Sequence, residues 1–163
     1  VRANAPNAVA LGGWNLPESS TTAAPTVLEV QSRAVVFQPE LAQYVPLALV
    51  DHESLVEHVP NARDMPGSIP MPVSMTGCIA EEDDEDAFQI DATSGTTLDI
   101  RVESRELGFP LDPVVQVLDA SGKVLKEVDD TSGGRDVRFD FAVPADGPLT
   151  IAVRDLHRSG GPR

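Results

Sequence analysis

The sequence predicts an all-β protein, a jelly-roll-like antiparallel β-sandwich preceded by an irregular N-terminal arm. Apolar and polar residues alternate along most segments after residue 72, as expected for half-buried strands. These segments recur roughly every 8–12 residues. Turns rich in Gly and Asp, such as residues 119–122 and 144–147, separate them. Short strands joined by such turns, with almost no helical periodicity, are typical of sandwiches and jelly rolls.

We interpret residues 1–55 as an arm or linker with short strands, a candidate remnant of an upstream domain. Residues 1–26 are rich in Ala, Asn, Pro, Ser and Thr and show no periodicity. Short β-prone runs follow at residues 27–30, 34–37 and 45–50. Four prolines between residues 51 and 72 exclude a regular helix over most of that segment. It is predicted to wrap the domain that follows.

The sandwich is predicted to extend from residue 56 to residue 163. Residues 114–118 are almost entirely apolar and predict a central strand, which a hairpin turn joins to residues 124–128. Only 4% of residues are aromatic, so Val, Leu and Ile must fill most of the core. The alternation predicts burial of Leu98, Ile100, Val102, Val115, Val117, Phe139, Phe141, Ile151 and Val153.

An acidic hexad, residues 81–86, lies between two alternating segments, residues 73–79 and 87–91. A run of like charges is usually a solvated or disordered tail. Its position between two predicted strands favours a loop at one end of the sheet instead. Carboxylates on such a scaffold are the groups that a hard cation such as Ca²⁺ requires.

The charge balance excludes several classes of partner. The chain has 26 acidic and 12 basic residues and a formal net charge of −14. Nucleic-acid binding and docking on anionic lipid both need basic patches, so neither is expected. No apolar run reaches the roughly 18–20 residues of a membrane span, so no membrane insertion is expected. The single cysteine, Cys78, forbids an internal disulfide and is expected to be a small buried apolar residue.

Catalytic motifs are missing. The sequence has neither a Gly-x-Ser-x-Gly elbow nor a His-Glu-x-x-His pair. Asp112 and Asp119 flank a predicted strand and could act as an acid–base pair, but turn capping is the favoured interpretation. We therefore expect no enzyme, and a cryptic hydrolase is the disfavoured alternative.

An ordered series of short motifs resembles the bacterial pre-peptidase C-terminal (PPC) domain. No single motif is specific, but their order is, and together they cover about two-thirds of the chain. Residues 107–113 and 155–161 are also similar to copies in large secreted proteins of planctomycete-type bacteria. The motifs lie at residues 56–61, 73–79, 84–88, 94–98, 107–113, 118–122, 128–130, 144–147 and 153–155.

The resemblance implies a calcium site shared by the entry segment and the acidic loop. Carried over position by position, its candidate ligands are Glu57, Asn61, Asp83, Asp84 and Asp86. Val59 and Ala62 stand where the family often has side-chain oxygens, which removes one or two ligands from the 6–8 that Ca²⁺ usually takes. A solvated acidic loop without a specific site is therefore the open alternative.

The resemblance implies a non-catalytic accessory or binding module of a larger exported bacterial protein, located in the periplasm, at the cell surface or outside the cell. Its expected partners are other domains of the parent protein or an extracellular polymer. Trp14, Tyr44 and Phe109 are the only plausible aromatic contacts for a sugar, which disfavours a polysaccharide.

The alternative function is a structural subunit or fragment of a larger extracellular or periplasmic assembly that pairs through an open strand edge. Family domains normally add a last strand after the turn at Gly160 and Gly161, and that strand is expected to be missing here. The edge left open would then pair with residues 27–30 or 34–37, or with a neighbouring chain.

Overall fold

The computed structural model describes residues 9–10, 22–23, 26–28, 33–36, 45–58, 61–131 and 133–160. The chain divides into two compact units, Val1–Ser54 and Leu55–Arg163, and each is described by itself. The described residues are all-β apart from a 3₁₀ helix at Arg105–Leu107, which confirms the predicted fold class. Among them, no helix has the length and apolar character needed to cross a membrane.

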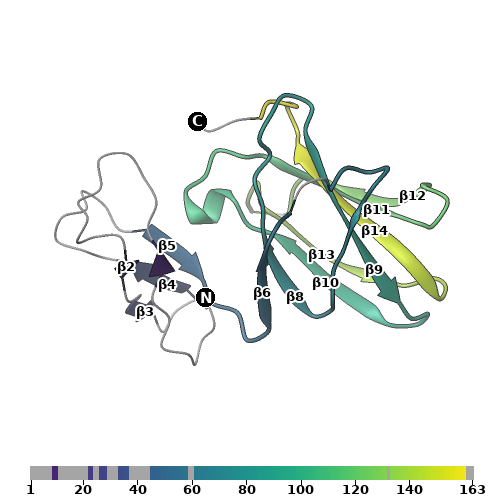
Figure 1. Cartoon of the computed structure of the whole chain (residues 1–163), viewed down its shortest axis with the longest axis horizontal. Helices are drawn as coiled ribbons and strands as arrows, with labels where there is room; N and C mark the ends of the chain where they lie inside the picture. The colour runs from purple at the N-terminus through teal and green to yellow at the C-terminus, as the bar shows by residue number, and fades with distance from the viewer. Residues whose placement is uncertain are drawn as a thin grey trace. The chain divides into compact units, whose positions relative to one another are not determined.

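The N-terminal unit contains a three-stranded antiparallel sheet in the order β3-β4-β5 (Figure 1). Its strands overlap the three runs predicted from the sequence, and they pair with one another. Residues 27–30 and 34–37, which we expected to pair with an open edge, thus already have partners in their own sheet. Trp14 and Tyr44 lie outside the described residues. The strands of this unit are β1 (Val9–Ala10), β2 (Thr22–Ala23), β3 (Thr26–Leu28), β4 (Arg33–Val36) and β5 (Val45–Ala48), with β1 and β2 as a separate pair.

The second unit is built on a five-stranded sheet in the order β12-β11-β14-β9-β7. Its middle strand, β14, is antiparallel to both β11 and β9, whereas the short β7 runs parallel to β9. The predicted hairpin joins β11 and β12. These strands are β7 (Gly67–Ser68), β9 (Glu85–Ala92), β11 (Pro113–Leu118), β12 (Val124–Val128) and β14 (Gly147–Asp155).

Two further strand pairs complete the described strands, and of these β10–β13 is antiparallel. One pair is β10 (Thr97–Val102) with β13 (Val137–Ala142), and the other is β6 (Glu53–Val56) with β8 (Val73–Thr76). Leu98, Ile100 and Phe139 of the β10–β13 pair pack against a core that includes Ile90 and Val117 of the five-stranded sheet. Because the two pairs are not hydrogen-bonded to each other, the jelly-roll connectivity stays a prediction.

Burial of the predicted core is graded across the domain. Val115, Val117 and Phe141 are buried, at 0%, 0% and 7% exposure. The remaining predicted core residues are only half-buried: Leu98, Ile100, Val102, Phe139, Ile151 and Val153.

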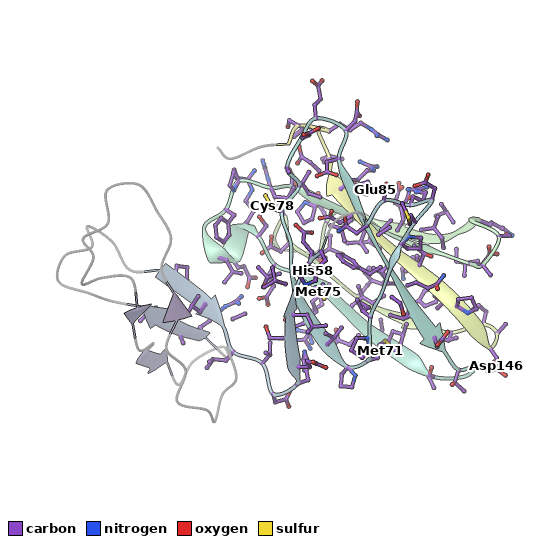
Figure 2. All side chains as sticks on the ribbon, viewed as in Figure 1. His58, Met71, Met75, Cys78, Glu85 and Asp146 are labelled. Carbon is purple, nitrogen blue, oxygen red and sulfur yellow. The ribbon has the colours of Figure 1, made fainter. Side chains whose placement is uncertain are left out.

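Cys78 is exposed, which corrects the expectation that it is a buried apolar residue. The apolar run around it does not continue as a strand, since β8 ends at Thr76. Cys78 therefore lies in the segment between β8 and β9, beyond the part of the chain that strand pairing holds in the core. Side chains are drawn in Figure 2, where Cys78 is labelled.

Candidate functional site

Glu57, Asn61 and Asp86 meet at the start of β9. The amide Nδ2 of Asn61 donates to Asp86 Oδ1 at 3.0 Å and to Glu57 Oε2 at 3.3 Å. Asn61 and Asp86 are each only 5% exposed. Glu57 directly follows β6, and Asn61 lies between β6 and β7, so two segments supply the group: residues 57–61 and the start of β9. Together with Asp84, described below, these residues form what we call the entry cluster.

The main chain holds the entry cluster in place. The amide of Glu57 donates to Thr76 O at 3.0 Å, and its carboxylate accepts from the amide of Cys78 at 2.7 Å. A Cβ atom on Gly77 would lie 2.5 Å from Glu57 Oε2 and 3.4 Å from Asp86 Oδ2. Only glycine leaves room for the carboxylate there, because Cβ contacts below 3.0 Å require a neighbour to move.

The electrostatics of the cluster are unfavourable for two ionised acids. Burial raises the pKa of Asp86 to about 7, and the hydrogen bond and charge of Glu57 and the charge of Asp84 add to the effect. The hydrogen bond from Asn61 opposes the rise. Within the described part of the chain, Glu57, Asp84 and Asp86 make no salt bridge with a basic side chain. A buried carboxylate in such a setting binds a proton or needs a cation.

The acidic hexad is divided between a turn and the first residues of β9. Asp84 lies in the turn, where its Oδ2 accepts the amide of Ala80 at 2.7 Å. Asp83 turns away toward Arg158, with an ion pair of 3.3 Å, and its amide donates to Arg158 O at 3.0 Å. Of the five predicted ligands, Glu57, Asn61 and Asp86 are in contact, and Asp84 acts on Asp86 through its charge. Asp83 is not in contact with them.

The entry cluster has part of what a Ca²⁺ ion requires. Two carboxylates and one amide converge, and oxygen ligands of this kind are those that Ca²⁺ selects. As arranged, the described residues contain no group of three or more His, Cys, Asp or Glu side chains positioned to hold a metal ion. The remaining oxygens of a coordination shell would have to come from the amide oxygen of Asn61, main-chain carbonyls and water.

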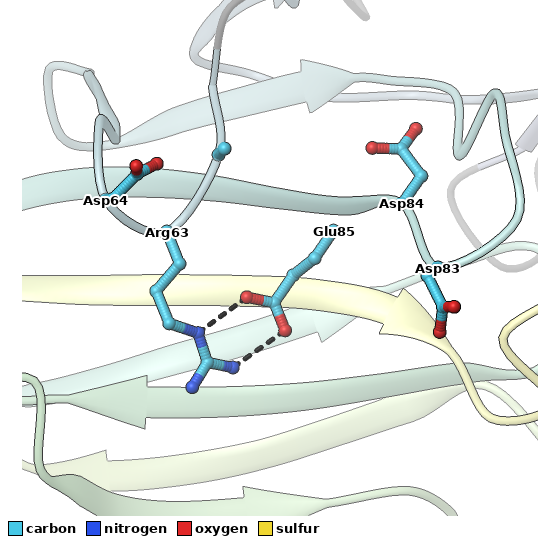
Figure 3. Close-up of a pocket in the computed structure, with 6 residues that line it drawn as sticks. Arg63, Asp64, Asp83, Asp84 and Glu85 are labelled. Carbon is cyan, nitrogen blue, oxygen red and sulfur yellow. Dashed lines mark hydrogen bonds and ion pairs between the residues drawn. The ribbon is translucent and has the colours of Figure 1, made fainter.

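A second clamp, not predicted from the sequence, lies on the opposite face of β9. Arg63 forms a two-bond pair with the carboxylate of Glu85, at 2.6 and 2.7 Å (Figure 3). Arg63 also donates to Gln116 Oε1 at 2.5 Å. Arg63 and Glu85 border an open hollow of about 470 Å³ that is also lined by Asp64, Asp83 and Asp84. Strand alternation could have indicated this arrangement, because Glu85 and Asp86 must point to opposite faces.

The segment at residues 61–63 is therefore held on both faces of β9. Asn61 reaches Asp86 on one face, and Arg63 reaches Glu85 on the other. Between them, the carbonyl of Asn61 accepts the amide of Ala87 at 2.5 Å. The wrapping linker predicted from the proline-rich sequence is thus fastened at the position where the entry cluster forms.

The other buried acids have structural roles. Asp155 accepts the amide of Asp112 at 3.2 Å and both the amide and the hydroxyl of Ser159, at 3.0 and 2.7 Å. Burial alone would raise the pKa of Asp155, but the hydrogen bonds from Ser159 and from the amide of Asp112, with the charge of His157, together outweigh burial and lower that pKa. Asp112 pairs with Arg135 at 3.4 Å.

Asp119 caps the hairpin turn by accepting the amides of Ser121 and Lys123 at 2.8 and 3.1 Å, so the turn-capping interpretation of Asp119 is confirmed.

Comparison with known proteins covers the region that contains the five-stranded sheet. Residues 84–155 match the family model of the bacterial pre-peptidase C-terminal domain. The match begins at Asp84 in the entry cluster and ends at Asp155, the last residue of β14. A search of curated proteins gave no match.

Proposed function

Since residues 84–155 form a bacterial pre-peptidase C-terminal (PPC) domain, we propose that this chain supplies the accessory module of a larger exported bacterial protein. PPC domains are non-catalytic accessory domains of secreted bacterial peptidases. Other domains of the parent protein are accordingly the first partners to consider, and an extracellular polymer is the second. The observation that carries this proposal is the family match together with the all-β fold of the matched residues.

The accessory role can be tested with the purified chain. We expect no hydrolysis of fluorescent casein, with or without Ca²⁺, and specific co-sedimentation with at most one class of insoluble polymer among collagen, chitin and cellulose. The decisive contrary result is casein hydrolysis that co-purifies with the chain and is lost in one point variant of a described polar residue. Binding to a parent-protein domain is measured by titration calorimetry once the neighbouring domain is expressed.

The entry cluster is proposed to bind one Ca²⁺ ion through Glu57, Asn61, Asp84 and Asp86. Support comes from the carboxylates of buried Asp86 and half-buried Glu57, which lack a basic partner among the described residues. Further support comes from Gly77, whose missing side chain leaves room for Glu57. Bound Ca²⁺ would supply the positive charge that lets both acids ionise. It would also join the entry segment to β9, because Glu57 and Asn61 precede the matched domain and Asp86 belongs to it.

A calcium titration followed by thermal unfolding tests this assignment. Ligand binding to the folded state stabilises it by about 2.7 kcal/mol at a hundredfold excess over Kd. The variant Glu57→Gln should lose most of this response. Glu82→Gln is the matched control, since it removes the same charge from the acidic hexad outside the cluster. If Ca²⁺ stabilises both variants equally, or does not stabilise the wild type at millimolar concentration, the entry cluster is not a calcium site and the hexad is only a solvated acidic loop.

A further inference from the structure

We propose that residues 156–160 form a clasp that closes against the loop before β9, and that closure of the clasp and calcium binding at the entry cluster stabilise each other. The clasp directly follows β14, and the loop, residues 80–84, contains most of the acidic hexad (Figure 1). The contacts of the clasp stand by themselves, whereas its coupling to calcium rests on the site proposed above.

Three contacts join the clasp to the loop. The amide of Asp83 donates to Arg158 O at 3.0 Å, and Arg158 Nη1 donates to Asp83 Oδ1 at 3.3 Å. Gly160 lies directly against the main chain of Glu81, so that an added Cβ would overlap the Glu81 carbonyl group. Any side chain at position 160 would therefore force the two main chains apart. These contacts turn Asp83 toward the end of β14, in the direction opposite to Asp84 (Figure 3).

The other end of the clasp is fixed to the body of the domain. Asp155 Oδ2 accepts the amide and the hydroxyl of Ser159 at 3.0 and 2.7 Å, and Asp155 O accepts the amide of Arg158 at 3.1 Å. Asp155 is only 4% exposed. In contrast, the side chains of Arg158 and Asp83 are 59% and 67% exposed. The contacts with the loop are therefore those that can open while the base of the clasp stays in place.

Backbone conformation shows that the two contacting residues are held under strain. Asp83 has a φ of 63° and Arg158 a φ of 53°, and among the described residues these are the non-glycine residues with positive φ. A left-handed conformation costs free energy for a residue with a Cβ, and it is less common for Arg than for Asp. Each strained residue is held by the same two hydrogen bonds to the other. We therefore expect Asp83 and Arg158 to relax together when the clasp opens.

The loop connects the clasp directly to the entry cluster. Asp84 Oδ2 accepts the amide of Ala80 at 2.7 Å, and the amide of Asp84 donates to Glu81 O at 3.3 Å, so the loop is a tight turn. Asp83, held by the clasp, immediately precedes Asp84. Calcium on Asp84 and Asp86 would restrict the same turn that the clasp restricts. The second event then has less conformational freedom to remove, and coupling of this kind is reciprocal.

Trypsin measures closure of the clasp, because cleavage after Arg158 requires this segment to leave the loop and extend. The test variant is Gly160→Ala, which pushes the clasp away from the loop. Gly134→Ala is the matched control, since its Cβ would lie 4.0 Å from the amide nitrogen of Asp136, an ordinary contact. Loss of about one main-chain hydrogen bond should raise the rate of cleavage after Arg158 about tenfold in Gly160→Ala, and the control should match the wild type.

The coupling is measured in both directions. Titration calorimetry gives the calcium affinity, which should be about fivefold weaker in Gly160→Ala than in the wild type or Gly134→Ala. Saturating Ca²⁺ should slow cleavage of the wild type after Arg158 by the same factor, because the coupling is reciprocal. A free peptide of residues 154–163 corrects for any effect of Ca²⁺ on the protease itself.

Hydrogen exchange on the wild type gives a measurement that does not depend on the folding of a variant. The amide of Asp83, which donates to Arg158 O, should be protected in EGTA and exchange more slowly in Ca²⁺. An unprotected Asp83 amide, or cleavage of the wild type as fast as that of the free peptide, would show that the clasp is open and would overturn the proposal.

The remaining outcomes separate the clasp from the calcium site. Equal calcium affinities of the wild type and Gly160→Ala would overturn the coupling and leave the calcium site intact. Faster cleavage in Ca²⁺ would show that Asp83 leaves Arg158 to bind the metal, which reverses the sign of the coupling and also overturns it. A wild type that binds no Ca²⁺ would overturn the calcium site together with the coupling, whatever the protease shows for the clasp.

Discussion

Replacing Asp86 with Asn should stabilise the calcium-free protein at pH 8 and abolish its response to calcium. The substitution should thus raise stability without calcium and remove the stabilisation that calcium provides, a combination that few substitutions of a buried residue produce. At pH 8 without a cation, Asp86 is forced to ionise beside Glu57 in a site where it is 5% exposed. Asn has nearly the same shape and remains neutral, and its amide can still donate to Glu57.

The pKa of Asp86 sets the size and pH range of the effect. In the folded protein it is raised to about 7, above the ordinary value of 3.8. The contribution of protonated Asp86 to the free energy of unfolding is therefore fully present below about pH 4. It is lost as the pH rises to about 7. The difference between the two pKa values of Asp86 corresponds to a loss of at most about 4 kcal/mol in the free energy of unfolding. The new amide can keep its oxygen toward Asn61 Nδ2, but burying its polar NH2 group costs free energy, so we expect a net gain of about 2 kcal/mol at pH 8.

The assay is thermal unfolding of the wild type and Asp86→Asn in EGTA, at pH values from 4.5 to 8. A gain of about 2 kcal/mol should raise the Tm of Asp86→Asn by about 10 °C at pH 8 for a domain of this size. At pH 4.5 this gain should be gone and Asp86→Asn should be the less stable protein, since the wild-type carboxyl is then protonated when folded and only the cost of burying the new amide remains. Added Ca²⁺ should raise only the wild-type Tm, and more at pH 8 than at pH 5.5.

Two results would refute this reasoning. If Asp86→Asn is less stable than the wild type at pH 8 in EGTA, the carboxylate must have a favourable partner and the unpaired-acid description is wrong. If the Tm difference does not change between pH 4.5 and 8, Asp86 does not titrate in that range. Asp91→Asn is a suitable control, because Asp91 is an exposed acid on the same strand.

Three further predictions concern packing and local geometry. Phe141→Ala should cost about 3–5 kcal/mol in urea unfolding because Phe141 is a core residue, and Phe139→Ala should cost less because its ring is half-buried; equal costs would contradict the burial gradient. Gly77→Ala should lower calcium affinity by calorimetry, since the new Cβ displaces Glu57, and unchanged affinity would remove Glu57 from the site. Asp136→Ala should cost about 1–2 kcal/mol, because its carboxylate accepts the amides of residues 104–106 at 2.8–3.1 Å; a smaller cost would show that water replaces this cap.

The sequence by itself determined the fold class and the position of most strands in the second unit. The alternation of Leu98, Ile100 and Val102 with charged residues could be satisfied only by a half-buried strand. The Asp119 turn placed the β11–β12 hairpin, because Asp and Gly at those positions satisfy turn amides locally. Such signals depend on neighbours within a few residues, and they can therefore be read from the chain alone.

The tertiary structure decided which of the predicted residues meet. Glu57, Asn61 and Asp86 come together, whereas Asp83 turns toward Arg158, a residue 75 positions away. The same holds for burial, since the register partners Ile151 and Val117 lie in similar sequence patterns, yet Val117 is completely buried and Ile151 only half-buried. Contacts between distant segments depend on strand order and on which layer lies across from each side chain. Local periodicity specifies the face of a strand, but only the packing of the layers specifies what that face meets.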